Sequence, residues 1–193
     1  LTRFVIWCAA GICVLAMTTT AGCVAFHPMT IDEVPFRQRA QTQEQDLVSV
    51  TVAVPSSRET KKLFGVNLSR QNIQPVWLEI RNKDTVPYWF FPSHLDPAYY
   101  SPNEAAFKHR LPLGGETHQN LTHHFQAVSL DNYIPPGTTN SGFVYCNLDE
   151  GIKHVNVTLL GIKSFKTFTF IVPIPDMRVD FEKIEHEALY EAE

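Results

Sequence analysis

Charged side chains are scarce in this chain: Asp, Glu, Lys and Arg make up 19% of its 193 residues, against about 25% in ordinary soluble domains. The net charge is −4 with histidine neutral, so the sequence lacks the basic excess of a nucleic-acid-binding protein. The G-x-S-x-G, Walker, G-x-G-x-x-G and H-E-x-x-H motifs of common enzyme classes are also missing. Since 44% of the residues are apolar, we expect an ordered core rather than a disordered chain.

A membrane-spanning run is missing as well. Residues 4–17 carry no charge and are almost wholly apolar, but a spanning helix needs about 20 such residues. Arg3 gives this stretch a weakly basic start, small residues follow at 18–22, and Cys23 comes next. A basic start, a short apolar region and then small residues are typical of a secretory signal peptide.

The same stretch resembles the signal peptide of bacterial lipoproteins. Its end resembles the lipobox of that family, because Ala21, Gly22 and Cys23 match it, with Thr20 where Leu is usual. The resemblance implies cleavage before Cys23, a diacylglycerol on the Cys23 thiol and acylation of the new amine. Two or three acyl chains hold a protein stably on a membrane.

Val24 bears on which membrane is reached. In enteric-type lipoproteins an Asp directly after the cysteine retains the protein in the inner membrane, so Val24 implies sorting to the outer membrane, with the domain on the periplasmic side. An uncleaved membrane-anchoring helix is the alternative. If Cys8 and Cys13 leave with the signal peptide and Cys23 is acylated, Cys146 is the one thiol left, and no internal disulfide can form.

The chain divides into four predicted parts. Residues 1–22 are the signal peptide, and residues 23–46 are the lipidated cysteine with a flexible, Gln-rich tether. Residues 47–175 are the folded domain. Residues 176–193 are a tail with seven acidic and two basic side chains. We expect the tail to be solvated, with partner binding as the alternative.

Alternation of apolar and polar residues predicts the main strands. It is strict over residues 48–54 and 76–81, and it recurs at 168–172. The segment 149–151, Asp-Glu-Gly, is a turn signal between two strand-like segments, so the sequence predicts a hairpin there.

Two short helices are predicted, one after Ser56 and one after Ser101, because each serine precedes a Glu at capping-box spacing. Residues 111–121 are predicted to form a loop, and a weaker strand is predicted near 122–130. About seven short strands with two short helices indicate a mainly β fold. We expect an antiparallel β-sandwich, immunoglobulin-like in architecture.

An aromatic run supplies candidate binding residues: Tyr88, Trp89 and Phe90, followed by Tyr99 and Tyr100. Alternation buries only half of such a run in a one-sided sheet, so the remaining rings need a cover, a ligand or a partner. The helix that follows them is one possible cover. A partner protein or an apolar envelope ligand is the other, and base stacking is disfavoured without a positive field.

Four side chains are weak candidates for a metal site: His94, Asp96, His118 and His124. Imidazoles and carboxylates bind zinc or copper where three or four converge. The spacing matches no ligand signature, so ordinary hydrogen-bonded side chains are the simpler explanation. Cys146 shares a strand face with apolar neighbours, and we expect it to pack as a small apolar residue.

The sequence therefore predicts a lipid-anchored lipoprotein of a bacterial cell envelope, whose non-enzymatic domain binds or supports an envelope component. It predicts no cofactor, no catalytic residue and no nucleic-acid partner. One alternative is a periplasmic metal-binding protein or metalloenzyme that uses His94 and the 118–124 region. The other is a carrier of an apolar envelope ligand.

Overall fold

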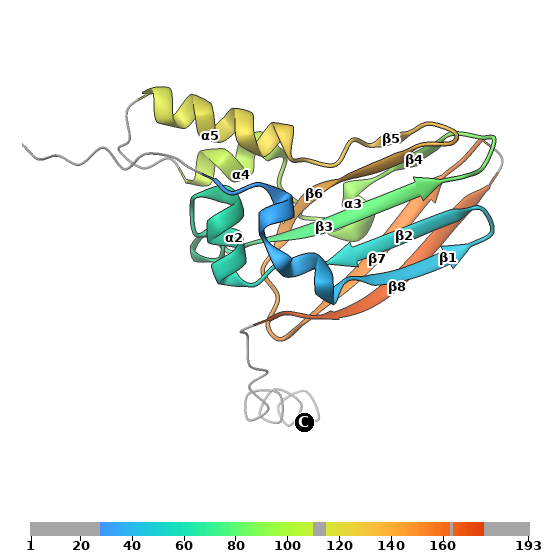
Figure 1. Ribbon diagram of the computed structural model, residues 1–193, viewed down its shortest axis with the longest axis horizontal. Helices are drawn as coiled ribbons and strands as arrows, with labels where there is room; N and C mark the ends of the chain where they lie inside the picture. Colours follow the sequence, from blue (N-terminus) through green and yellow to red (C-terminus); the bar gives the residue numbers. More distant parts are fainter. Residues whose placement is uncertain (1–27, 110–114, 163, 176–193) are drawn as a thin grey trace, which may run out of the picture.

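The computed structural model describes residues 28–109, 115–162 and 164–175, and at residues 115–117 it describes the backbone alone. Two antiparallel four-stranded sheets face each other as a sandwich (Figure 1). Sheet A has the strand order β1-β2-β3-β6, and sheet B has the order β5-β4-β7-β8. The predicted mainly β fold is confirmed, while an immunoglobulin-like architecture stays a prediction.

The core between the sheets follows from the alternation in the strands. Val50, Leu78 and Phe170 are among the inward residues, and they lie in one buried cluster that both sheets supply. The strands are β1 Gln41–Gln45, β2 Val48–Ala53, β3 Ile73–Asn82, β4 Tyr88–Phe90, β5 Tyr133–Ile134, β6 Thr139–Asn147, β7 Ile152–Leu160 and β8 Phe165–Pro173.

Both helices predicted from capping boxes are confirmed. At the start of the first helix, the Ser56 hydroxyl accepts the Glu59 N–H and the Glu59 carboxylate accepts the Ser56 N–H. Ser101 and Glu104 form the same pair of bonds. The helices are α2 Ser57–Phe64, α3 Pro92–Leu95, α4 Pro102–Lys108 and α5 Gly115–Ala127, with 3₁₀ segments at Ile31–Glu33, Pro35–Arg39 and Leu68–Gln71.

A second buried cluster covers the outward face of sheet A at one end. There Trp77 and Phe143 of the sheet pack with Phe64 of α2 and Phe125 of α5. The helices α2, α4 and α5 gather at this end of the sandwich in Figure 1. Trp77 thus faces away from the aliphatic core, as its position in the alternation predicts.

The structure corrects the predicted flexible tether of residues 23–46 over its described part, 28–46. Phe36 is fully buried in the second cluster, and β1 pairs with β2. The side-chain amides of Gln41 and Gln43 donate to the backbone carbonyls of Ile171 and Thr169 at 3.1 and 2.7 Å. The polar side chains of β1 thus have a role in the fold, because two of them bond the backbone of β8 in the other sheet.

The loop predicted over 111–121 and the strand over 122–130 are wrong for the residues described there. Residues 115–127 form α5, with Leu121 and Phe125 buried one turn apart. Tertiary packing against α2 stabilises this helix in spite of its weak local signal.

The hairpin predicted around 149–151 is also wrong. The turn exists, with Gly151 at φ 77°, but β6 pairs with β3 in sheet A and β7 pairs with β8 in sheet B. The chain crosses from one sheet to the other at this turn.

The predicted signal peptide, its lipidated Cys23 and the acidic tail lie outside the described residues. In the described part of the chain, every helix is too short or too polar to cross a bilayer.

Candidate functional site

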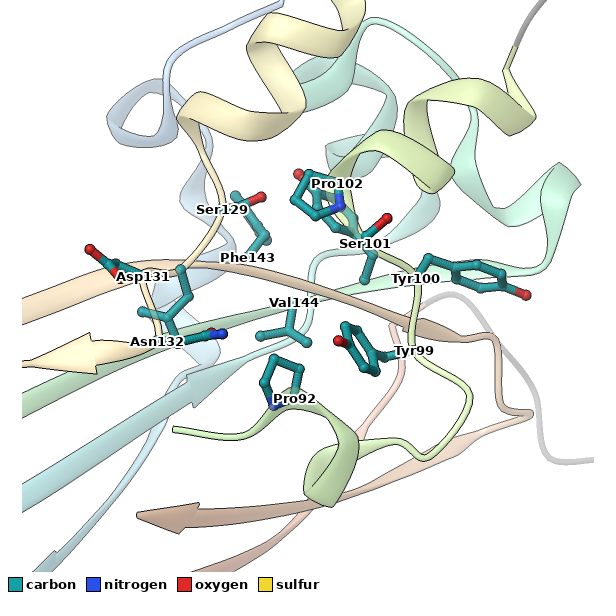
Figure 2. Close-up of a pocket in the computed structure, with 12 residues that line it drawn as sticks. Pro92, Tyr99, Tyr100, Ser101, Pro102, Ser129, Asp131, Asn132, Phe143 and Val144 are labelled. Carbon is teal, nitrogen blue, oxygen red and sulfur yellow. The ribbon is translucent and has the colours of Figure 1, made fainter. Parts of the chain in front are cut away.

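A pocket of about 310 Å³ lies along the outer edge of β6 (Figure 2). Residues 99–102 and 129–132 form its walls, and residues 143–145 of β6 lie between them. Pro92, at the start of α3, lies across the mouth from Ser101.

The backbone of β6 holds the two walls apart. The Leu130 N–H donates to the Phe143 carbonyl at 3.1 Å, and the Phe143 N–H donates to the Val128 carbonyl at 2.9 Å. Two residues along β6, the Tyr100 N–H donates to the Tyr145 carbonyl at 2.7 Å. The pocket is the gap between these two attachments.

The lining combines ring faces with polar groups. Pro92 and Tyr99 present apolar surface, while Ser101, Asp131 and Asn132 bring hydroxyl, carboxylate and amide groups. A ligand with both an apolar face and hydrogen-bonding groups suits such a lining better than an acyl chain does.

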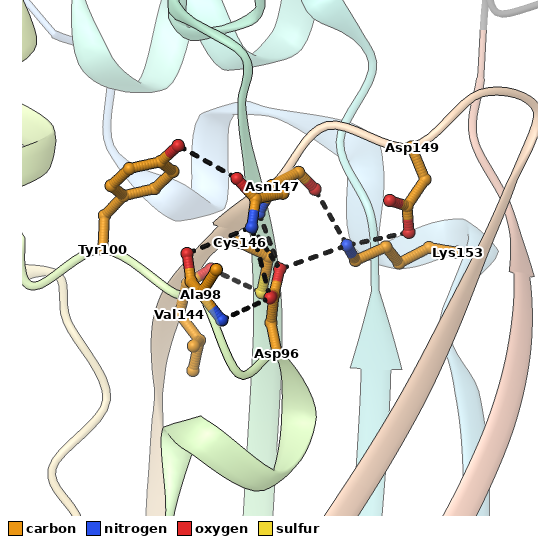
Figure 3. A network of polar contacts seen from close by, with 8 residues as sticks. All are labelled: Asp96, Ala98, Tyr100, Val144, Cys146, Asn147, Asp149 and Lys153. Carbon is orange, nitrogen blue, oxygen red and sulfur yellow. Dashed lines mark hydrogen bonds and ion pairs between the residues drawn. The ribbon is translucent and has the colours of Figure 1, made fainter.

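A polar network behind the Tyr100 wall fixes that wall (Figure 3). The Tyr100 hydroxyl donates to Asn147 Oδ1 at 2.9 Å, and the Asn147 N–H donates to the Asp96 carboxylate at 2.7 Å. The Lys153 ammonium lies 3.6 Å from Asp96 and 2.8 Å from Asp149, and it donates to the Asn147 carbonyl at 2.8 Å. Lys153 is only 3% exposed, so this is a nearly buried ion pair.

Asp96 is ionised in this network. Burial raises its pKa, but the N–H groups of Asn147 and Ala98 and the charge of Lys153 outweigh burial and hold the pKa below its ordinary value. The carboxylate oxygens accept N–H groups of Asn147 and Ala98 and lie beside the Lys153 ammonium, so they hold the Tyr100 wall in place.

The predicted metal ligands are not brought together. His94 lies on α3 with its ring against Phe91, while His118 and His124 lie on α5. The His124 ring bonds the Leu63 carbonyl at 2.8 Å, and burial lowers its pKa. Within residues 28–109, 115–162 and 164–175, no three His, Cys, Asp or Glu side chains are placed to hold one ion.

The predicted aromatic residues divide between three environments. Tyr88 and Phe90 are 1% exposed in the core between the sheets, so the structure corrects their assignment as binding residues. Trp89 points outward from sheet B, with its ring centroid 5.4 Å from that of Tyr133. Tyr99 and Tyr100 line the pocket.

The helix expected to cover these rings does not cover Trp89. α4 packs against α5, and Trp89 keeps 38% of its surface exposed.

Cys146 is fully buried among apolar side chains between the sheets, which confirms its predicted packing. Burial raises the pKa of its thiol well above the ordinary value, so little reactive thiolate forms near neutral pH.

Several residues of the pocket were not candidates from the sequence: Pro92 and the segment 129–132. Ser129 and Leu130 reach the site because they pair with Phe143 of β6, and no local sequence pattern predicts such a contact. Outward residues of β7 and β8 were missed too, although their alternation places Leu160 and Phe165 on an exposed face.

The chain matches no protein-family model, and searches among curated proteins and solved structures find no significant match.

Proposed function

We propose that this chain is a lipid-anchored, non-enzymatic binding protein of a bacterial cell envelope. Acyl chains on Cys23 hold it on the outer membrane, facing the periplasm, and the β6-edge pocket binds a ligand or a segment of a partner protein.

The observation that carries the proposal is the position of Cys23, at the end of a lipobox-like motif and close to the fold. Four residues separate Cys23 from Pro28, the first residue described. Five Cα–Cα steps span at most about 18 Å. Without the long tether, the helical end of the sandwich stays near the membrane surface.

The pocket supports binding rather than storage of a fully apolar ligand, because Ser101, Asp131 and Asn132 contribute polar groups to its lining. The metal-binding alternative is not proposed, since its four predicted ligands lie apart or are already bonded.

Cell fractionation tests the anchor. We expect the wild-type chain in the outer-membrane fraction and the Cys23→Ser chain elsewhere. An unchanged distribution of the variant would contradict the anchor.

A photoreactive phenylalanine analogue at Tyr99 tests the pocket in intact cells. We expect an adduct, detected by mass, that is lost when Asn132→Trp fills the pocket. The same analogue at Thr139, on the far part of β6, is the matched control. No adduct at position 99, or equal adducts at both positions, would contradict the binding role.

A further inference from the structure

The outward face of sheet B carries no Asp, Glu, Lys or Arg at any described strand position. The exposed face of an antiparallel sandwich is ordinarily polar, and charge on it keeps sheets from associating. Sheet A follows that rule where it is exposed, since Glu44, Glu79 and Arg81 lie on its outward face. The outward face of sheet B departs from that rule.

An apolar row crosses this face at one end. Tyr133, Trp89, Leu160 and Phe165 are cross-strand neighbours on the four successive strands of the sheet. They are 43%, 38%, 46% and 71% exposed. Four large apolar side chains in register form a contiguous patch of the kind found at interfaces.

The rest of the face is free of acidic and strongly basic side chains too. Asn156 pairs with Thr169 and Thr158 pairs with Thr167 in its middle. At the other end, Ile152 and Ile171 are exposed at 42% and 57%, and the exposed His154 lies opposite Ile171. Along the strands the face is apolar, then neutral polar, then largely apolar again.

We propose that the sheet B face binds a second copy of this chain, face to face. A surface without Asp, Glu, Lys or Arg buries no carboxylate, ammonium or guanidinium when it meets itself, whereas a charged partner would lose its hydration without an opposite charge to meet. The three threonines and the asparagine of the middle can bond the same groups of the other copy.

The strand order specifies the arrangement. A two-fold axis along the strands sets β4 of one copy against β7 of the other, and β5 against β8. The row then meets itself: Trp89 contacts Leu160 of the other copy, and Tyr133 contacts Phe165 of the other copy.

Two other occupants fit less well. The acidic tail, residues 176–193, has seven acidic side chains and would meet no Lys or Arg on the face. A bilayer surface is usually recognised with basic side chains beside apolar ones. This inference does not depend on lipidation of Cys23.

Sedimentation equilibrium of the full chain, in detergent of matched density, tests the proposal. We expect the wild type to be a dimer at about 100 µM. Leu160→Lys and Trp89→Asp should each weaken the dimer at least about 100-fold, since each buries an unpaired charge. Thr139→Lys, on an exposed position of sheet A, is the matched control and should leave the dimer unchanged.

Mixing the two variants is the decisive step. The lysine introduced at position 160 would then face the aspartate introduced at position 89 of the other copy, and we expect dimers of mixed composition to form again. Circular dichroism checks that each variant is folded. A monomeric wild type, a Leu160→Lys dimer of wild-type affinity or no recovery on mixing would overturn the proposal. So would a monomeric Cys23→Ser chain that floats with anionic vesicles and loses that binding on Leu160→Lys.

Discussion

Replacing Asp96 with Asn tests whether the network behind the pocket stabilises the fold. The carboxylate accepts the N–H groups of Asn147 at 2.7 Å and Ala98 at 3.0 Å, and it lies 3.6 Å from the Lys153 ammonium. A hydrogen bond to a charged group contributes about 1.5–3 kcal/mol. Asn keeps one acceptor oxygen, so one of these bonds is lost and the attraction to Lys153 ends. We expect the free energy of unfolding to fall by about 2–4 kcal/mol.

Denaturant titration of the full chain at pH 7 measures this loss, and the melting temperature should fall by roughly 5–15 °C. Asp149→Asn is the matched control. Asp149 lies 2.8 Å from the same ammonium, but its side chain is 43% exposed. Exposed ion pairs contribute about 0–1 kcal/mol, so we expect a loss within that range.

The pH dependence gives a second readout. The folded-state pKa of Asp96 lies below its ordinary value of 3.8, so the unfolded state binds the proton more readily. The stabilisation is complete above pH 3.8 and is lost as the pH falls through the lower, folded-state pKa. The difference between wild type and Asp96→Asn should therefore shrink below pH 3.8. A loss under about 1 kcal/mol at pH 7, or an equal loss in Asp149→Asn, would refute the reasoning.

Three further substitutions follow from single contacts. Gly142→Ala would place a Cβ 2.4 Å from the Leu130 backbone nitrogen, so we expect at least about 2 kcal/mol of destabilisation in denaturant titration; an unchanged midpoint would contradict this. Tyr145→Phe removes one of two hydroxyls that donate to the Phe125 carbonyl, since Ser129 Oγ also donates to it at 2.6 Å and Tyr145 does so at 2.9 Å; the loss of one bond should cost about 0.5–1.5 kcal/mol by the same assay. Burial lowers the folded-state pKa of His124 below 6.5, although the carbonyl bonded to its ring opposes this. The free energy of unfolding should therefore fall as the pH drops below 6.5, and in His124→Gln the melting temperature should depend less on pH over that range. A melting temperature that varies with pH as in the wild type would contradict this assignment.

Local signals were enough to predict much of the fold. The capping boxes at Ser56 and Ser101 need only residues within one turn, and both helices begin where these boxes predict. Alternation of apolar and polar residues predicts the strands around 48–54, 76–81 and 168–172, because each strand has one face in a core.

The failures have tertiary causes. The helix α5 has little apolar character, although Leu121, Phe125 and Val128 keep helical spacing. The polar residues Thr122, His123 and His124 lie between the first two and weaken this pattern. A turn signal at 149–151 is the same whether the flanking strands pair or change sheets. Asp96 and Lys153 are 57 positions apart, so no local pattern brings them together.

The most direct test of the account is the intact mass of the protein extracted from membranes, wild type against Cys23→Ser. The account predicts a wild-type mass that begins at Cys23 and includes acyl chains, with neither the cleavage nor the acyl mass in the variant. A wild-type chain that is uncleaved and unacylated would contradict the lipid anchor, and with it the proposed place of this protein in the cell envelope.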